Sequence, residues 1–496
     1  MSETEGQSPA REPVDSRLDG RILRSSGWVA LSVAGNQLAS IISLLVLARL
    51  LEPKAFGLVA LAWTVLAFAD KIQESGVGSA LIYRRQEVEQ AAASALIWAP
   101  LASLILYAAT FLLAPVLAHL LHTPGLVSVL RVLGLVLLLR GLMVVPAAVL
   151  GRNLAYRARA KADVGGSFVQ LATALTLAFA GFGVWSLVFG ALAGTAAQCV
   201  ILWTVVPWWP SPTAASRRIL FEMMRYGRFV SAGSILSVID NTIDNIAIAR
   251  LLGTTPLGYY AIAFRIADFP TSVLGYVVGR VMFPVYSMLQ GDLQAVRRGY
   301  IQNLQRIAIV ALPVSVGIAV AAKPIVLTLF GEKWLLAVTP LRILAFYGLL
   351  KSLIAPAGEL FKGIGRPHLN PLLSVAHLAL AVPILYVLIR SLGLDGAALG
   401  MLVLMAVTGL PAMFLAMRLV NVSIRDTAHA LVTPILCSAL LAVALTVLLG
   451  ATQSLAPVVS LLILVSAGLL VFSGAAAAFA RPVLTPIWVS IRESRS

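Results

Sequence analysis

Charged side chains occur inside segments of this chain that are otherwise apolar enough to cross a lipid bilayer. Charges at that depth are costly and usually face a protein interior or an aqueous cavity, so they mark candidate functional sites. Carboxylates there can hold a cation or a proton, whereas Arg and Lys can bind an anionic group. The residues are Asp70, Lys71, Glu74, Arg140, Asp163, Asp240, Asp244, Arg265, Asp268, Arg280, Lys351 and Glu359.

The most polar of these segments carries Ser237, Asp240, Asn241 and Asp244 on one helical face. Two carboxylates one turn apart repel each other in a low dielectric, so they would share a proton or hold a cation. The neutral oxygens of Ser237 and Asn241 would suit Na⁺. We therefore expect a coupling-ion site for Na⁺ or H⁺ here. The alternative is a structural ion pair with a basic group of a neighbouring helix.

Five basic residues inside the predicted membrane segments indicate a second kind of site. If they converge on one cavity, they would bind an anionic head group such as a diphosphate through charge-assisted hydrogen bonds. They are Lys71, Arg140, Arg265, Arg280 and Lys351. A purely structural alternative is pairing along a helix, of Asp70 or Lys71 with Glu74 and of Arg265 with Asp268. Glu359 is a further polar residue at this depth.

Membrane-spanning helices must position these charges. The 496 residues are 59% hydrophobic and 12% charged. Continuous apolar runs of about 20 residues exclude a barrel of alternating strands. We predict an all-α polytopic membrane protein with about 14 transmembrane helices. The expected segments are 28–51, 56–80, 91–119, 125–149, 162–182, 184–206, 228–251, 257–284, 303–330, 336–361, 369–390, 396–417, 427–450 and 455–480.

A repeat divides the chain into two similar halves. Ala48–Ala62 reads ARLLEPKAFGLVALA, and Ala249–Ala263 reads ARLLGTTPLGYYAIA in register without a gap. Six predicted crossings precede the second copy, so the halves are parallel and related by an axis along the membrane normal. The first predicted helix, like its repeat partner 228–251, has a polar face, which holds Asn36, Ser40 and Ser43. Membrane proteins of this construction usually keep their substrate path between the halves, which favours a transporter of two pseudosymmetric lobes.

The distribution of Lys and Arg places both termini in the cytoplasm. The expected linker has Trp208, Trp209 and a basic face, so it would lie against membrane lipid. The expected divisions are a cytoplasmic N-terminal segment (1–27), an N-terminal lobe (28–206), an amphipathic cytoplasmic linker (207–227), a C-terminal lobe with two extra terminal helices (228–480) and a cytoplasmic tail (481–496).

Several other functions are disfavoured. The net charge of +16 follows from basic cytoplasmic loops and needs no nucleic-acid partner. The sequence has no phosphate-binding loop, no metal spacing among its five His and no CxxC motif, so we expect no cofactor, metal or catalytic residue. A membrane polysaccharide polymerase or glycosyltransferase is the alternative outside transport, although the predicted outer loops carry only Glu52, Glu332 and Asp395 as acidic residues.

The run Leu47–Ala62, followed by Ser75–Ile82, resembles the polysaccharide transporter family of Wzx-type oligosaccharide flippases. The resemblance is nearest to the colanic-acid and lipopolysaccharide export branch, within the multidrug/oligosaccharidyl-lipid/polysaccharide exporter superfamily. It implies two lobes around a central cavity and alternating access driven by an ion gradient. The implied substrate is an undecaprenyl-diphosphate-linked oligosaccharide, which crosses the bacterial inner membrane for lipopolysaccharide or exopolysaccharide synthesis, with polysaccharide assembly machinery as a partner.

Related lipid II flippases of the superfamily use cavity arginines and an acidic residue on the seventh helix. Asp240 and Asp244 match that acidic position by helix and not by a sequence motif. The alternative within the superfamily is a multidrug/cation antiporter. Such exporters favour acidic, aromatic cavities, and the basic residues in the membrane segments argue against that alternative.

Overall fold

The computed structural model describes most of the chain between residues 35 and 479. The residues left undescribed within that span are 75–77, 79–80, 82–86, 154, 207 and 290. Side chains are also undescribed at 74, 212, 226–234, 272–281 and 475–479. The predicted N-terminal segment and C-terminal tail, and the side chains of Glu74 and Arg280, therefore lie outside the described residues.

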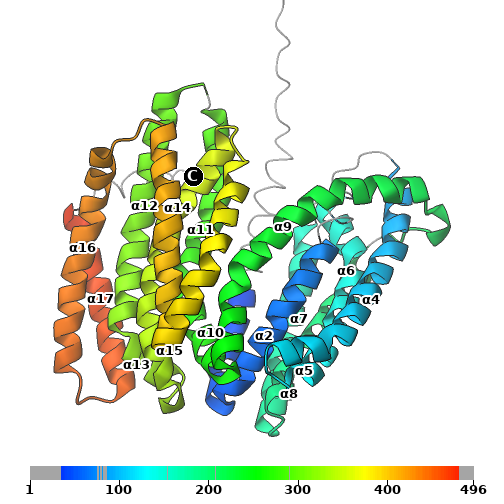
Figure 1. Ribbon diagram of the computed structural model, residues 1–496, viewed down its shortest axis with the longest axis horizontal. Helices are drawn as coiled ribbons and strands as arrows, with labels where there is room; N and C mark the ends of the chain where they lie inside the picture. Colours follow the sequence, from blue (N-terminus) through cyan, green and yellow to red (C-terminus); the bar gives the residue numbers. More distant parts are fainter. Residues whose placement is uncertain are drawn as a thin grey trace, which may run out of the picture.

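The described residues form helices and no strands, which confirms the all-α prediction. One bundle holds the N-terminal helices: Gly35–Leu50, α2 (Pro53–Glu74), α4 (Val88–Leu120), α5 (Leu126–Leu133), α6 (Leu135–Arg152), α7 (Tyr156–Phe179) and α8 (Val184–Val205). The other holds α9 (Arg217–Leu252), α10 (Thr254–Ala267), α11 (Phe269–Met288), α12 (Leu293–Val320), α13 (Ala322–Leu329), α14 (Val338–Gly363), α15 (Leu369–Leu419), α16 (Ile424–Ala451) and α17 (Pro457–Phe479). Figure 1 shows the two bundles side by side, the predicted two-lobe arrangement.

Every predicted membrane segment is mainly helical where it is described, although 125–149, 257–284 and 303–330 are each divided between two consecutive helices. Ten helices of the described part are long and apolar enough to cross a membrane. The longest, α15, is two helices joined at Gly393, whose φ of 60° and ψ of −131° are not helical. This glycine separates the predicted segments 369–390 and 396–417, because only glycine adopts such a conformation without strain.

The last part of the predicted linker (217–227) and the span after it form one continuous helix, whereas the sequence analysis separated them. Residues 217–227 are the first turns of α9, which arches over the N-terminal lobe in Figure 1. Its basic start is tied to that lobe by an ion pair of 2.7 Å between Arg218 and Glu87. Trp209, just before it, is 63% exposed. Lack of a helix-breaking residue between 217 and 252 explains the continuity, since neither Pro nor Gly-Gly interrupts the segment.

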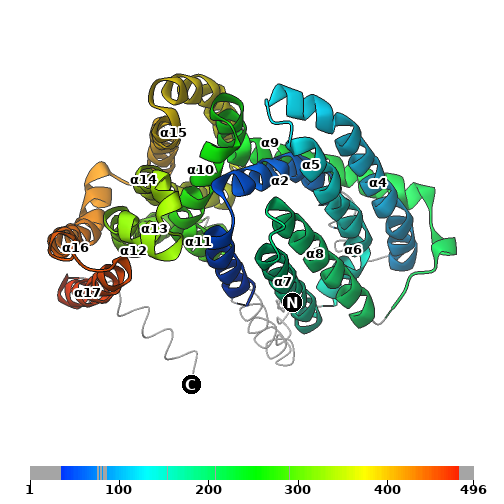
Figure 2. The same ribbon diagram turned by 90° about the horizontal axis from the view of Figure 1, so that it is seen from below.

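The repeated glycines bring the two lobes into contact. A Cβ atom on Gly57 would lie 1.7 Å from the carbonyl oxygen of Thr254, and one on Gly258 would lie 1.9 Å from that of Pro53. The two contacts are equivalent by the repeat, so α2 and α10 cross as symmetry mates at their N-terminal ends (Figure 2). Close backbone approach through small residues is a common way for helices to associate in membranes.

A tryptophan of the C-terminal lobe closes the same end of the molecule. Trp334, in the 3₁₀ helix η2 (Glu332–Ala337), is fully buried and donates from Nε1 to the Ala48 carbonyl at 2.8 Å. Its ring packs edge-on against Phe56 of α2 and Tyr259 of α10, at centroid distances of 5.4 and 5.7 Å. Residues of both repeat copies and of η2 therefore form one apolar cluster across the lobe boundary.

Candidate functional site

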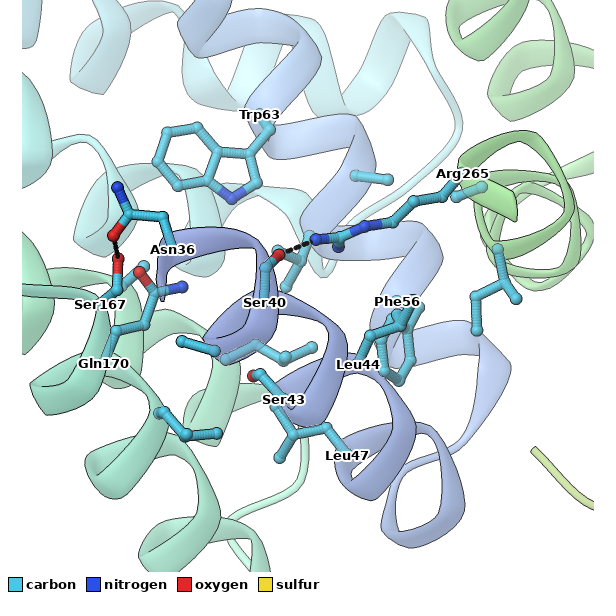
Figure 3. Close-up of a pocket in the computed structure, with 18 of the residues that line it drawn as sticks. Asn36, Ser40, Ser43, Leu44, Leu47, Phe56, Trp63, Ser167, Gln170 and Arg265 are labelled. Carbon is cyan, nitrogen blue, oxygen red and sulfur yellow. Dashed lines mark hydrogen bonds between the residues drawn. The ribbon is translucent and has the colours of Figure 1, made fainter. Parts of the chain in front are cut away.

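A cavity of about 560 Å³ lies between the N-terminal helices and α10. Asn36, Ser40 and Ser43 of the first helix line it, as do Ser167 and Gln170 of α7 (Figure 3). The polar face of the first helix that the sequence indicates thus forms one wall. Asn36 Oδ1 accepts a hydrogen bond of 2.9 Å from Ser167 Oγ, which fixes that wall to α7.

Arg265 supplies the positive charge of this cavity. It extends from α10 and donates to Ser40 Oγ of the first helix, so it reaches across the lobe boundary (Figure 3). No carboxylate among the described residues forms an ion pair with it. In particular, the pairing with Asp268 that the sequence allows is not formed. A guanidinium in a cavity without a carboxylate partner can bind a phosphate or diphosphate.

Arg140 of α6 lines an adjoining pocket of about 220 Å³, which shares Asn36, Trp63, Ser167 and Gln170 with the main cavity. The guanidinium is paired with Asp70 of α2 and lies 5.5 Å from the Trp63 ring. Arg140 and Arg265 therefore line adjoining parts of one space from opposite lobes. They differ in charge environment, because the carboxylate of Asp70 neutralises Arg140.

Tight packing of α7 on α8 brings amide groups to this space. A Cβ on Gly194 would lie 2.6 Å from the Gln170 Cβ, and one on Gly166 would lie 2.9 Å from the Gln198 Cβ. The glycines thus let both glutamines sit at the helix interface. Gln198 Nε2 donates to Asp163 Oδ1 at 2.7 Å. Gln170 and Gln198 line the pockets as donors and acceptors that sugar hydroxyls could bind.

An apolar groove of about 690 Å³ adjoins the polar cavity. The residues common to both are Gln37, Leu44 and Arg265. From there the groove continues along apolar side chains of α12, α16 and α17, such as Val314, Leu445 and Leu469. The two extra terminal helices supply much of its wall, and the first helix of the N-terminal lobe supplies the rest near Gln37 and Leu44.

A cluster of charged and phenolic groups lies within the C-terminal lobe. Lys351 of α14 forms an ion pair of 3.0 Å with Asp268 and lies within 6 Å of the Phe264 and Tyr347 rings. Asp244 of α9 is 3% exposed and accepts a 2.7 Å hydrogen bond from the Tyr260 hydroxyl. Its other oxygen accepts from the backbone N–H of the next residue. Asp244 is therefore held by protein donors.

Asp240 has a different environment from Asp244. Its Oδ1 lies 3.7 Å from Nε2 of His377 on α15, and it is buried without a hydrogen-bond donor among the described residues. His377 Nδ1 lies 2.9 Å from Thr408 Oγ1. Sequence reasoning missed His377, because a single histidine in an apolar segment has no metal-ligand spacing. Its only signal was a titratable side chain at membrane depth.

The remaining predicted site residues are placed separately. Asn241 Nδ2 donates to the Ser237 carbonyl at 2.6 Å, so these two residues bond to each other along α9. Glu359 pairs with Lys362 at 2.7 Å on the same helix. Lys71 lines neither the cavity nor its adjoining pocket. Of the five predicted basic residues, the structure thus brings Arg140 and Arg265 to the cavity and places Lys351 in the neighbouring cluster.

The chain resembles membrane proteins of polysaccharide synthesis. It is 25% identical to an uncharacterised membrane protein in the cps region of Klebsiella pneumoniae (80% of this chain, 82% of that protein). It is 27% identical to the succinoglycan biosynthesis transport protein ExoT of Rhizobium meliloti (70% of each chain). It is 23% identical to the lipopolysaccharide biosynthesis protein WzxC of Escherichia coli (80% of this chain, 81% of that protein).

Solved transporters share the fold. The lipid II flippase MurJ in an inward closed conformation superposes with a TM-score of 0.74 at 13% identity, over 92% of this chain and 99% of that one. An inward-facing multidrug resistance MATE transporter of the MOP superfamily gives 0.66 at 19% identity, over 78% and 96%. Residues 46–339, more than half of the chain, match the polysaccharide biosynthesis protein family. The chain is therefore a multi-pass membrane protein that belongs to this family and has the two-lobe fold of the superfamily's transporters.

Proposed function

We propose that the protein is a flippase that moves an undecaprenyl-diphosphate-linked oligosaccharide across the bacterial inner membrane during cell-surface polysaccharide synthesis. The observation that carries this proposal is the meeting of a polar cavity and an apolar groove at Arg265. A lipid-linked sugar has three parts in one order: polar sugars, a diphosphate and an apolar tail. The structure offers a complementary surface for each part in that order.

Each part would be held by ordinary chemistry. Hydroxyls and amides of Ser43, Ser167 and Gln170 would bind sugar hydroxyls. Arg265 would bind the diphosphate with charge-assisted hydrogen bonds. The apolar groove would remove the first isoprene units of the tail from contact with polar groups.

Movement would follow from alternate opening of the two lobes. With both termini in the cytoplasm, the crossing of α2 and α10 at Gly57 and Gly258 lies at the outer end. The crossing then separates the cavity from the outside until the lobes change their arrangement. A coupling ion bound in the C-terminal lobe would bias one arrangement over the other.

The names of the relatives agree with transport in polysaccharide synthesis. A multidrug antiporter is the competing function, and the MATE fold is shared. A cationic drug would meet the charge of Arg265, which no described carboxylate neutralises, so the cavity electrostatics favour an anionic substrate.

The test is a reconstituted translocation assay. Proteoliposomes would contain a fluorescent polyprenyl-diphosphate oligosaccharide, and an impermeant quencher would report its arrival in the opposite leaflet. We expect translocation by the wild type, a loss of at least about tenfold in Arg265→Gln, and normal rates in the exposed control Arg342→Gln. Efflux of a cationic dye without translocation of the lipid would instead establish the antiporter.

A further inference from the structure

Two side chains on neighbouring helices of the C-terminal lobe form an incomplete hydrogen bond. We propose that Asp240 of α9 and His377 of α15 together bind one proton, and that this proton is the ion that biases the lobe arrangement. The proposal deepens the proposed function, on which its transport part rests. Proton binding by the pair itself does not depend on that function.

Hydrogen-bond geometry fixes where the missing proton goes. The Thr408 hydroxyl donates its single proton to the Leu404 carbonyl at 2.8 Å. This assigns the Thr408 oxygen as the acceptor and Nδ1 of His377 as the donor across their distance of 2.9 Å. In the neutral ring, Nε2 is then a bare lone pair. It faces the Oδ1 lone pairs of Asp240 at 3.7 Å.

Two acceptors that face each other need one proton between them. Asp240 Oδ1 is buried and has no donor among the described residues, so no described group supplies that proton. The His377 side chain is 13% exposed and the Asp240 side chain is 31% exposed, but Oδ1, the oxygen that faces His377, is buried. Uptake of a proton converts the contact into a charge-assisted hydrogen bond from imidazolium to carboxylate. The balance is one proton gained from one side of the membrane and one lost to the other.

The surrounding charges do not neutralise the carboxylate of Asp240. Lys351 attracts Asp240, but it already forms an ion pair with Asp268. Asp244, on the same helix as Asp240, adds a second carboxylate nearby. On α2, which also packs on α9, the described charges include Asp70, which Arg140 neutralises. The other titratable groups that face this region are Tyr260 of α10 and Tyr347 of α14.

A proton fits this site better than Na⁺. Sodium requires several oxygen ligands, and Asp244, the second carboxylate predicted for it, already accepts from the Tyr260 hydroxyl and from the backbone N–H of Asn245. The remaining partner of Asp240 is a ring nitrogen, which binds protons at physiological pH.

The position of the pair explains how a proton could affect the lobes. Asp240 lies on α9, which packs against α15 of its own lobe and against α2 of the other. Asn245, just over one turn further along, donates to Thr64 of α2 at 3.2 Å. Protonation would strengthen the tie between α9 and α15, and release of the proton would loosen it. The same helix thus links the proton site to the lobe boundary.

The first experiment observes the proton itself. Protein labelled with ¹⁵N-histidine in nanodiscs would be titrated by NMR, and His377→Gln would assign the resonance. We expect the neutral ring to carry its proton on Nδ1. We expect the second proton to bind at a pH higher by about one unit in the wild type than in Asp240→Asn, because the variant removes the facing charge. A neutral ring protonated on Nε2, or an unchanged midpoint, would overturn the proposal.

The second experiment tests coupling with the same reconstituted lipid. Wild-type translocation should respond to an imposed pH gradient and be unaffected by a Na⁺ gradient. His377→Gln should lose the response to pH, whereas the exposed control His429→Gln should keep it. If His377→Gln does not fold, the exchanged variant Asp240→His/His377→Asp, which retains the pair, replaces it and should keep the response. A Na⁺-driven wild type, or a pH response that survives in His377→Gln or is lost in the exchanged variant, contradicts the coupling role. The NMR result stands separately if the lipid itself is not transported.

Discussion

The two lobes differ in the charged groups that they leave without a partner at membrane depth. In the described part of the N-terminal lobe, each such carboxylate has a donor: Asp70 accepts from Arg140, and Asp163 accepts from Gln198. In the C-terminal lobe, Asp240 Oδ1 has no donor and Arg265 has no carboxylate partner among the described residues. A charged group that already has its hydrogen-bond partner gains little from a ligand, whereas a charged group without a partner is stabilised when a ligand binds to it.

The difference assigns distinct roles to the halves of a symmetric repeat. The N-terminal lobe provides a neutral polar wall, and the C-terminal lobe provides the groups that respond to an anion or a proton. The two lobes are symmetric where they contact each other, at Gly57 and Gly258. They are not symmetric in the groups that would bind the substrate and the proton. We therefore expect changes at the crossing to affect both lobes, and changes in the clusters to affect them unequally.

The largest effect should come from the crossing that both lobes share. Gly57→Ala or Gly258→Ala places a methyl group within 2 Å of a backbone carbonyl of the facing helix, which cannot move as a side chain would. Overpacking typically costs about 1–3 kcal/mol, and a backbone collision lies at the upper end or beyond. The unfolding temperature in detergent should fall sharply for both variants. Gly317→Ala, which meets no atom within 4 Å, is the matched control. Equal stability of all three variants would show that the lobes do not meet as described.

The next effect separates the two arginines. Arg265→Gln should slow lipid translocation about tenfold or more, and neutralising any nearby carboxylate should not rescue it. Arg140→Gln should also slow lipid translocation, because it leaves the carboxylate of Asp70 without its ion-pair partner. The double variant Asp70→Asn/Arg140→Gln should then recover much of the rate, as expected for a mutually neutralising pair. A double variant as slow as Arg265→Gln would remove the distinction between the lobes.

A smaller effect compares buried donors in the two lobes. Tyr260→Phe deletes the hydroxyl that donates to Asp244, a carboxylate that is 3% exposed, so it should cost about 1–3 kcal/mol of unfolding free energy. Ser167→Ala deletes the donor to the half-buried Asn36 and should cost about 1 kcal/mol or less. Chemical denaturation in mixed micelles would rank the two variants. The reverse ranking would argue against a tightly held Asp244.

The smallest effect concerns the loop ends outside the membrane. Asp426 caps α16 with Ser423 and pairs with Arg297, and these hydrogen bonds hold the pKa of its carboxyl below the ordinary value of 3.8. A carboxyl whose pKa is lowered by folding stabilises the folded state at pH values above its unfolded pKa. This stabilisation is lost as the pH falls through the folded pKa. Asp426→Asn should therefore reduce stability slightly at pH 7, and the reduction should be smaller near pH 2. Equal losses at both pH values would mean that the carboxylate charge has no part in the cap.

Local patterns in the sequence predicted much of this organisation. Apolar runs predicted the helices, and the repeat predicted the two lobes; the contact between the aligned Gly57 and Gly258 was found only in the structure. The 3.6-residue period gave the polar face of Asn36, Ser40 and Ser43 that lines the cavity. Membership of the polysaccharide transporter family, suggested by the run Leu47–Ala62, is confirmed by the family match.

Pairings between distant helices could not be predicted in the same way. Arg140 and Asp70 are 70 residues apart, and His377 and Asp240 come from helices separated by five others. The periodicity of one helix shows which of its faces is polar, but it does not show which neighbouring helix that face contacts. The sequence therefore gave five basic residues as one set, whereas packing neutralises Arg140 and Lys351 and leaves Arg265 in the cavity without an ion pair to a described residue.

The most direct test of the central claim is a comparison of lipid affinities. Undecaprenyl diphosphate and undecaprenyl monophosphate would be titrated separately into purified wild-type protein and Arg265→Gln, with binding followed by native mass spectrometry. We predict that the wild type binds the diphosphate lipid more tightly than the monophosphate lipid. Arg265→Gln should bind the diphosphate lipid about tenfold more weakly and should lose most of this preference. Equal affinities of the two proteins for the diphosphate would contradict the role of Arg265 and the substrate order built on it.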